Sequence, residues 1–257
     1  MRTEDYQDLF ELEEEFWWFV GMRHISAALL DPVLPGQLSR TVLDAGCGTG
    51  RNVRWLKRYA GAEAVVGMDL ASDALKLARQ RMQGLPVQAS ITDLPFPDSE
   101  FDLVTSFDVI VQLPQEAADE RSVREMYRVL RPGGIAFVRG PAYQWMRSGH
   151  DVALSTHRRY SLKELKGLLE GAGFRVVRAT YANSLLLPIA ALHRLVLKPI
   201  GLAQSGSDVT PLPTGLGWIN PIFQGLLRCE AAWLKSFNLP LPAGLSAICI
   251  VEKPTNM

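Results

Sequence analysis

The sequence lacks an excess of charge of either sign, because its 27 Lys and Arg residues are balanced by 27 Asp and Glu residues. Proteins that hold nucleic acid by neutralising phosphates usually carry a basic excess, so nucleic acid is not expected as a partner. Long apolar runs are also missing. No stretch of 18 uncharged apolar residues is present, and no membrane span is predicted. The first 15 residues hold seven acids and one base, which is not the pattern of a signal or transit peptide.

Cysteine is scarce as well. The three cysteines, Cys47, Cys229 and Cys249, lie far apart in the sequence, with neither a CxxC pair nor a His/Cys cluster. The sequence therefore predicts no metal site and no disulfide framework. Together with the missing leader, this pattern indicates a cytoplasmic protein.

What is present is the composition of an ordinary globular protein, with 47% apolar and 21% charged residues, which excludes disordered and fibrous classes. A length of 257 residues suits one large domain, and we expect residues 1–257 to form a single domain.

From Thr41 onward, short apolar runs alternate with stretches of helical periodicity. Such alternation is typical of a parallel sheet with helices on both faces. The expected helices are 8–31, 52–59, 72–82, 116–130 and 161–172, with Ser72 as an N-cap and a capping box from Ser161 to Glu164. The expected strands are 41–44, 64–69, 86–89, 101–107, 135–139, 174–181 and 245–252.

Two segments exceed a minimal version of this fold and are expected to form helical cap elements around a core at 40–181. Residues 1–35 contain the run Phe16-Trp17-Trp18-Phe19. Four consecutive aromatic side chains cannot all face one way on a helix, so at least one must contact something beyond the core. A lid over a ligand and a buried helix face both remain open as interpretations.

The second segment, residues 182–243, connects the last strand of the core to a final strand at 244–253. It is apolar, with seven of the sixteen prolines and only two acids. Connections of this length are often lids or binding elements. Three interpretations stay open for it: an apolar binding pocket, a homodimer surface, and a helix in weak contact with a membrane interface.

The most informative run is residues 42–52, in which Gly46, Gly48 and Gly50 follow a buried strand and precede a helix. Glycine allows a tight turn and lets a ligand lie against bare main chain, and a helix N-terminus adds free N–H groups. Asp69 ends the next strand, 25 residues after Asp44. A carboxylate at this position can accept hydrogen bonds from ribose hydroxyls. The pattern predicts a ligand that contains a nucleoside.

The glycine spacing separates two classes of ligand. The dinucleotide fingerprint GxGxxG would need glycine at position 51, which is Arg51, whereas the observed pattern is DxGxGxG. With this pattern the sequence resembles the class I S-adenosylmethionine-dependent methyltransferases of the type 11 kind. Three further stretches match that family in order, namely TDLPF at 92–96, FDLVTSFD at 101–108 and VLRPGG at 129–134. The resemblance covers residues 40–180, approximately.

The resemblance implies a Rossmann-like, doubly wound α/β sheet of about seven strands, mostly parallel with an antiparallel last strand. It implies S-adenosylmethionine as the cofactor, with Asp69 on the ribose and Asp93 on the adenine amine. Asp44 is expected to contact the amino group of the cofactor, to brace the glycine loop, or to do both. Arg23 is expected either to reach the cofactor's carboxylate or to lie solvated at the surface. The predicted cofactor-binding residues are Arg23, Asp44, Gly46, Cys47, Gly48, Gly50, Asp69, Leu70, Thr92, Asp93, Leu94 and Phe107.

The loop at 109–114 departs from the family, because many members have a histidine there and this chain has Gln112. Glutamine cannot act as a base, so any proton acceptor must come from elsewhere. His150, Asp151 and His157 follow the fifth core strand, at the sheet edge where ligands bind in such folds, and they are the candidate catalytic residues.

The alternative for this loop is a structural network in which Asp151 pairs with Arg158 or Arg159. The candidate substrate-binding residues are Trp17, Gln112, Tyr143, Trp145, Arg159 and Tyr160.

The predicted function is methyl transfer from S-adenosylmethionine to a small, hydrophobic or aromatic acceptor by in-line displacement. Two alternatives belong to other classes. One is a non-catalytic module that binds S-adenosylmethionine or serves in assembly. The other is a nicotinamide-dependent oxidoreductase, against which the absent GxGxxG counts.

Overall fold

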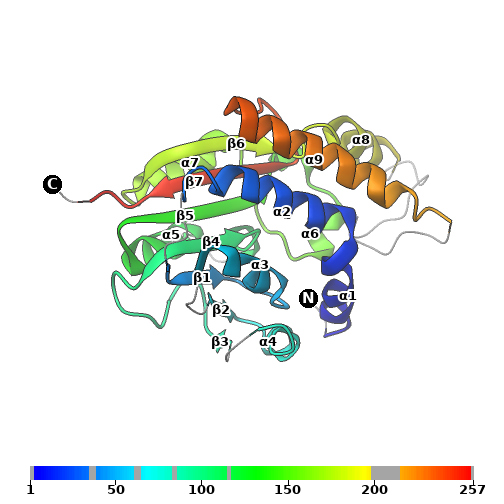
Figure 1. Cartoon of the computed structure of the whole chain (residues 1–257). Coiled ribbons are helices and arrows are strands. Elements are labelled where there is room, and N and C mark those ends of the chain that lie inside the picture. The colour runs from blue at the N-terminus through cyan, green and yellow to red at the C-terminus, as the bar shows by residue number, and fades with distance from the viewer. Residues whose placement is uncertain are drawn as a thin grey trace.

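The computed structural model describes residues 3–34, 39–60, 65–82, 86–114, 117–197 and 215–255, apart from the side chains of Thr3, Glu4 and His150. Seven strands form one sheet in the order β3-β2-β1-β4-β5-β7-β6 (Figure 1). The last strand in sequence, β7, is antiparallel to both of its neighbours, while the other pairings are parallel, as the resemblance implies. The strands are β1 (Val42–Ala45), β2 (Val65–Asp69), β3 (Val87–Gln88), β4 (Phe101–Phe107), β5 (Leu130–Pro141), β6 (Arg175–Ala182) and β7 (Ser246–Glu252).

Helices cover both faces of the sheet, and neighbouring residues of β1 show the two sides. The longer described helices are α1 (Thr3–Glu15), α2 (Trp17–Leu30), α3 (Arg51–Ala60), α5 (Ala118–Val129), α7 (Leu162–Gly171) and α9 (Ile219–Phe237). Shorter ones are α4 (Ser72–Ala78), α6 (Gly149–Ala153) and α8 (Leu187–Leu192), the last continuing into a π-helical turn at His193–Leu197. Val42 packs in one core cluster with residues of α2, α3 and α9, whereas Leu43 packs in a second cluster with residues of α5 and α7.

The single helix predicted at 8–31 is wrong, because the chain forms two helices that break at Phe16. Phe16 has extended backbone angles of φ −64° and ψ 132°, and its side chain is buried. The next backbone N–H, on Trp17, donates to the Asn220 side chain at 2.6 Å, which gives α2 a cap from a residue on α9. The aromatic run therefore lies at the junction of two helices, with Phe16 between them and Trp17, Trp18 and Phe19 in the first turn of α2.

Most predicted boundaries in the core hold to within a few residues. The capping box between Ser161 and Glu164 is confirmed. The N-cap predicted at Ser72 is wrong, since Ala71 occupies that position and its N–H donates to Asp69 Oδ1 at 2.9 Å. The predicted ends at Ala64 and Glu116 lie outside the described residues.

The chain's first and late helical segments pack against each other. On α9, Leu227 fills the space above Gly21 of α2, where a Cβ atom would lie only 2.2 Å from Leu227 Cδ1. Figure 1 shows α9 running along α2 on the same side of the sheet. Within the part of the chain that the structure describes, no helix combines the length and apolar character needed to cross a bilayer.

Candidate functional site

A cavity of about 620 Å³ opens at the carboxyl ends of β1, β2, β4 and β5. This edge is where parallel α/β sheets bind their ligands. The cavity walls come from α1 and α2, the glycine loop, the ends of the strands, the loop at 153–159, α8 with its π-turn, and the start of α9. The two segments that the sequence predicts as caps therefore both contribute walls.

The glycine loop adopts a backbone that favours glycine, with φ of +97° at Gly46, +53° at Gly48 and +85° at Gly50. At Gly46 a side chain would also collide with Val109, since its Cβ would lie 2.2 Å from Val109 Cγ2. A Cβ at Gly48 would meet nothing within 4 Å, and Gly48 lines the cavity. Gly48 is thus the point where a ligand can approach the main chain directly.

Asp69 ends β2 beside this loop and lines the cavity. Its Oδ2 accepts a hydrogen bond from Gly48 N at 2.9 Å, and its Oδ1 accepts one from Ala71 N at 2.9 Å. Each carboxylate oxygen can accept a second hydrogen bond. The carboxylate is therefore held rigidly by main chain while it retains the capacity to bind two hydroxyls.

A fully buried carboxyl group and a half-buried guanidinium lie near the loop, each with one buried atom that has no hydrogen-bond partner. Asp44 on β1 is fully buried, its Oδ1 accepts from Thr105 Oγ1 at 2.8 Å, and its Oδ2 has no hydrogen-bond partner. Arg23 on α2 donates to the Glu14 carbonyl oxygen at 3.3 Å, and its Nη1 is buried without a partner. A carboxylate and a guanidinium left unsatisfied in this way fit a zwitterionic amino-acid group, such as the methionine part of S-adenosylmethionine. Arg23 lines the cavity, whereas Asp44 lies behind its wall.

Burial raises the pKa of Asp44 to about 7, against an ordinary value of 3.8, although the Thr105 hydroxyl opposes this shift. Since the folded pKa exceeds the unfolded one, the stabilising contribution is full below pH 4, roughly, and is lost as the pH rises toward 7. We expect the free energy of unfolding of the ligand-free protein to fall between pH 5 and 7 by about 2 kcal/mol more than that of Asp44→Asn. Chemical denaturation of both proteins across this range measures the difference. Parallel pH profiles would contradict the assignment of this titration to Asp44.

The remaining predicted cofactor residues divide into two groups. Cys47, Leu70 and Phe107 line the cavity, together with Arg23, Gly46, Gly48 and Asp69. The cavity lining does not include Gly50, Thr92, Asp93 or Leu94. The neighbouring residues that do line it are Ala89, Ser90 and Ile91. Asp93 is exposed, and Thr92 hydrogen-bonds to Ser90 through the two hydroxyls at 2.8 Å. The predicted contact between Asp93 and adenine stays a prediction.

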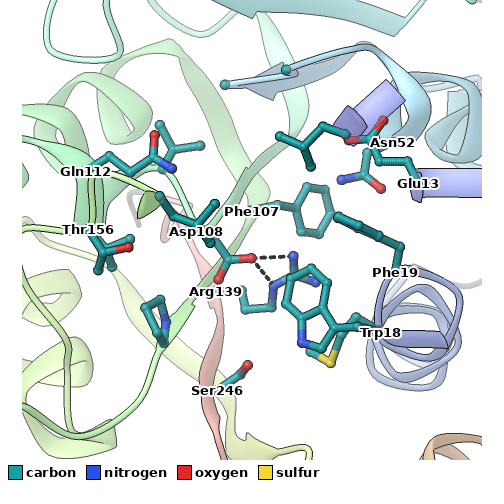
Figure 2. A pocket seen from close by; sticks show the side chains of 18 of the residues that line it. Glu13, Trp18, Phe19, Asn52, Phe107, Asp108, Gln112, Arg139, Thr156 and Ser246 are labelled. Atoms are coloured by element: carbon teal, nitrogen blue, oxygen red, sulfur yellow. Dashed lines mark hydrogen bonds and ion pairs between the residues drawn. The ribbon is translucent and has the colours of Figure 1, made fainter. Parts of the chain in front are cut away.

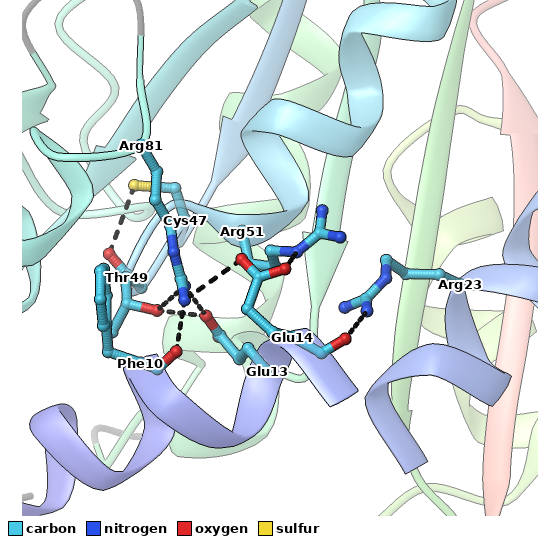
Figure 3. A network of polar contacts seen from close by, with 9 residues as sticks. Phe10, Glu13, Glu14, Arg23, Cys47, Thr49, Arg51 and Arg81 are labelled. Atoms are coloured by element: carbon cyan, nitrogen blue, oxygen red, sulfur yellow. Dashed lines mark hydrogen bonds and ion pairs between the residues drawn. The ribbon is translucent and has the colours of Figure 1, made fainter. Parts of the chain in front are cut away.

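Helix α1 is fastened over the glycine loop by a network of charged side chains, shown in Figure 3. Glu13 accepts hydrogen bonds from the Thr49 hydroxyl and from Arg81 Nη1, the latter at 2.7 Å. Glu14 pairs with Arg51 at 2.8 Å. Burial raises the pKa of Glu13, which lines the cavity. Sequence reasoning missed Glu13, because nothing in the acidic run 11–15 distinguishes the one side chain that turns inward.

An ion pair between Asp108 and Arg139 forms part of the cavity lining (Figure 2). Arg139 Nε donates to Asp108 Oδ2 at 2.9 Å, and the guanidinium packs over the rings of Trp18 and Phe107 at 5.0 and 5.1 Å. Asp108 follows β4 with φ +61°, and Arg139 projects from β5. Neither residue was predicted from the sequence to be part of the site. Arg139 lies within a predicted strand, and Asp108 is the last residue of the 101–108 motif, which was interpreted only as part of the cofactor site.

The loop predicted to supply a catalytic base contains a buried ion pair. Asp151 and Arg159 are both buried. Arg159 Nε donates a hydrogen bond to Asp151 Oδ1 at 2.7 Å, and Arg159 Nη2 donates one to Asp151 Oδ2 at 3.1 Å. This matches the alternative in which Asp151 pairs with a neighbouring arginine, and Asp151 does not line the cavity. His157 is exposed and lies outside the cavity wall, and the His150 side chain is outside the described residues.

Of the predicted substrate-binding residues, Trp17, Gln112 and Arg159 line the cavity. The other three are engaged in packing elsewhere. Tyr160 donates its hydroxyl proton to Asp119 Oδ2 at 2.6 Å, and Tyr143 stacks on Trp145 and on Tyr181. The described wall of the cavity does not include these three residues, and their predicted contact with a substrate stays a prediction.

Comparison with known proteins gives consistent results. A family model described as "Methyltransferase domain" matches residues 43–138. The chain is 33% identical over 168 residues to a probable S-adenosylmethionine-dependent methyltransferase of Mycolicibacterium smegmatis, covering 64% of this chain and 62% of that protein. It is 37% identical over 216 residues to methyltransferase GfsG of Streptomyces halstedii, covering 77% of this chain and 69% of that protein. The chain thus spans less than two thirds of the first relative's length.

A crystal structure of a S-adenosylmethionine-dependent methyltransferase from Archaeoglobus fulgidus has the same fold, with a TM-score of 0.61, 16% identity, and coverage of 95% of this chain and 99% of that one.

Proposed function

Because this chain belongs to the S-adenosylmethionine-dependent methyltransferase family, we propose that it transfers a methyl group from S-adenosylmethionine to a small acceptor with an apolar body. The observation that carries the proposal is one continuous cavity that joins two kinds of wall. The glycine loop and Asp69 lie on one side, and the Asp108–Arg139 pair with apolar side chains lies on the other.

When bound, S-adenosylmethionine supplies an activated methyl group on its sulfonium. The residues of this chain then need to bind, to orient and to exclude water. In the proposed arrangement Asp69 holds the ribose hydroxyls, while Arg23 and Asp44 neutralise the amino-acid group. Trp17, Trp18 and Phe107 shield the reacting centre from solvent.

The acceptor side of the cavity combines apolar walls with a few polar groups, which is typical of pockets for small molecules. Leu186 and Ile189 come from α8 and its preceding turn, Phe223 comes from α9, and Leu245 precedes β7. Asp108 and Arg139 supply a carboxylate and a guanidinium at the ends of β4 and β5. We propose that this pair orients the polar group of the acceptor and that, for a hydroxyl acceptor, the Asp108 carboxylate accepts its proton.

Asn183 adds a second polar group to this side. It lines the cavity with a backbone φ of +61°, and neither its amide nitrogen nor its amide oxygen has a hydrogen-bond partner. Its position is held by buried Glu230, which accepts a hydrogen bond from Asn183 N. Buried amides normally have partners, so an unpaired one beside a cavity supports a role in binding.

An assay with methyl-labelled S-adenosylmethionine tests the proposal. The protein is incubated with organic-soluble and aqueous fractions of a cell extract, and label and S-adenosylhomocysteine are measured in each. We expect transfer into the organic-soluble fraction, and strongly reduced transfer with Asp69→Ala. Transfer only in the aqueous fraction would refute the apolar acceptor, and turnover with neither fraction would favour the non-catalytic alternative.

We also propose a cytoplasmic location and no nucleic-acid partner. The three cysteines are unpaired, with Cys47 and Cys249 buried, which suits a reducing compartment. The balanced net charge offers no general attraction to phosphate backbones.

A further inference from the structure

Helix α1 lines the cofactor side of the cavity without belonging to the core of the protein. Tyr6, Leu9 and Leu12 form part of the cavity wall, and the leucines are only partly buried. Within the described residues neither hydrophobic core cluster includes a residue of α1, whereas several buried residues of α2 belong to the first cluster. Tertiary packing of an apolar face supplies most of the stability of a helix in a protein. The core therefore holds α1 less firmly than it holds α2.

The groups proposed to bind the cofactor lie next to α1. Near its beginning, burial raises the pKa of Tyr6, and the charge of the neighbouring Asp69 adds to the shift. Near its end, the Glu14 carbonyl oxygen accepts a hydrogen bond from Arg23 at 3.3 Å. Asp69 is the proposed ribose ligand and Arg23 the proposed carboxylate ligand. Helix α1 thus runs along the proposed cofactor site from one end to the other.

A single side chain from outside the cavity wall fastens α1 to the glycine loop (Figure 3). Arg81 follows α4, and its side chain is 6% exposed. Its Nη1 donates to Glu13 Oε2 at 2.7 Å and to Thr49 Oγ1 at 3.1 Å. Its Nη2 donates to the Phe10 carbonyl oxygen, and the guanidinium lies 3.7 Å from the centre of the Phe10 ring. We call the ion pair between Arg81 and Glu13 the latch.

The junction between α1 and α2 is anchored separately from the latch. The Glu15 carbonyl oxygen accepts hydrogen bonds from Asn220 Nδ2 at 2.9 Å and from Gln224 Nε2 at 2.8 Å, both on α9. Phe16 then has an extended backbone, which ends α1 as a separate helix. Movement of α1 about this fixed point would leave α2 and its packing against α9 in place.

We propose that α1 is a lid that moves to let the cofactor enter and leave, and that the latch holds it closed. This inference rests on the proposed function, because it places the cofactor between α1 and the glycine loop. An ion pair suits such a movement. When the lid opens, both charged groups regain water, which offsets part of the lost attraction. When the lid closes over a bound cofactor, Leu9 and Leu12 cover it and exclude water.

The rate constants for S-adenosylhomocysteine binding test the proposal on the full chain, measured by surface plasmon resonance. In Arg81→Met, the Glu13 carboxylate loses its guanidinium, so the closed lid becomes less favourable with or without the ligand. We expect the association and dissociation rate constants both to rise about tenfold. The Kd, which is their ratio, should change by less than about threefold. Loss of an ordinary binding contact would raise the dissociation rate constant alone.

Two further variants complete the set. Arg79→Met makes the same substitution two residues earlier, at an exposed position outside the cavity wall, and should keep the parent's rate constants. Glu13→Gln weakens the latch from the other side with little change in size. It should raise both rate constants about threefold, because the amide still hydrogen-bonds but carries no charge.

Hydrogen exchange followed by mass spectrometry measures the movement itself. We expect the amides of residues 4–15 to exchange faster than those of α2 in the ligand-free protein, and to become protected when S-adenosylhomocysteine binds. Arg81→Met should increase exchange in α1 and leave α2 and α9 unchanged, which also shows that the variant is folded.

Three results would overturn the proposal. The first is a dissociation rate constant that rises in Arg81→Met and Glu13→Gln while the association rate constant stays the same. The second is parent-like rate constants in both variants. The third is exchange in α1 that is as slow as in α2 and does not respond to the ligand. A parent protein that does not bind S-adenosylhomocysteine at all would instead refute the proposed cofactor site, and the lid with it.

Discussion

Asp69→Ala should weaken the binding of S-adenosylhomocysteine by about 2–4 kcal/mol, which is a loss of about 30- to 1000-fold in affinity. Two ribose hydroxyls would lose a charged acceptor and remain buried in the complex. The backbone N–H groups of Gly48 and Ala71 would lose the same acceptor, so the ligand would also meet a less ordered loop. Both effects act in one direction, and isothermal titration calorimetry measures their sum.

Asp93→Ala is the matched control, since it removes the same group from an exposed site outside the cavity wall. We expect it to cost less, because at most one hydrogen bond to the adenine amine is lost. An Asp69→Ala protein that remains folded and binds S-adenosylhomocysteine like the parent would show that the ribose lies elsewhere. A larger loss in Asp93→Ala than in Asp69→Ala would show the same.

Asp151→Ala should destabilise the folded protein by about 3–5 kcal/mol, because it leaves the Arg159 guanidinium buried without its carboxylate. The side chains of this pair are 1% and 2% exposed, so solvent screens the uncompensated charge very little. Urea denaturation measures the loss. This result would separate a structural role of Asp151 from the catalytic role that the sequence predicts.

Replacing both partners provides the control. Asp151→Leu/Arg159→Met removes the two charges together and should recover much of the lost stability, because a buried pair exchanged for apolar residues is often neutral. If Asp151→Ala were instead as stable as the parent but inactive, Asp151 would be catalytic and the structural assignment would be wrong.

The core of the fold could be predicted because its signals are local. The apolar runs of β1, β2 and β4 lie between helices of clear periodicity, and the Ser161–Glu164 capping box marks the start of α7 within the sequence itself. The break at Phe16 could not be predicted in this way. It depends on Asn220, which lies 203 residues from Trp17 in the sequence and caps it only after folding.

The residues of the candidate site divide in the same way, into those that the local sequence predicts and those that depend on contacts formed only on folding. Gly48 and Asp69 lie 21 residues apart in one strand–turn–helix–strand unit, whose geometry brings the glycine turn and the end of the second strand into direct contact. Arg139 looks like any residue of a strand until β4 and β5 pair and place it against Asp108. Asp151, in contrast, looks catalytic in the sequence because its burial against Arg159 is visible only in three dimensions.

A crystal structure of the protein with S-adenosylhomocysteine bound would test the proposed site most directly. We expect the ribose hydroxyls on Asp69, the amino-acid group between Arg23 and Asp44, and the sulfur facing the acceptor side of the cavity, where Asp108 and Arg139 lie. A ligand bound with its ribose away from Asp69, or with its sulfur turned away from Asp108 and Arg139, would refute the proposed site.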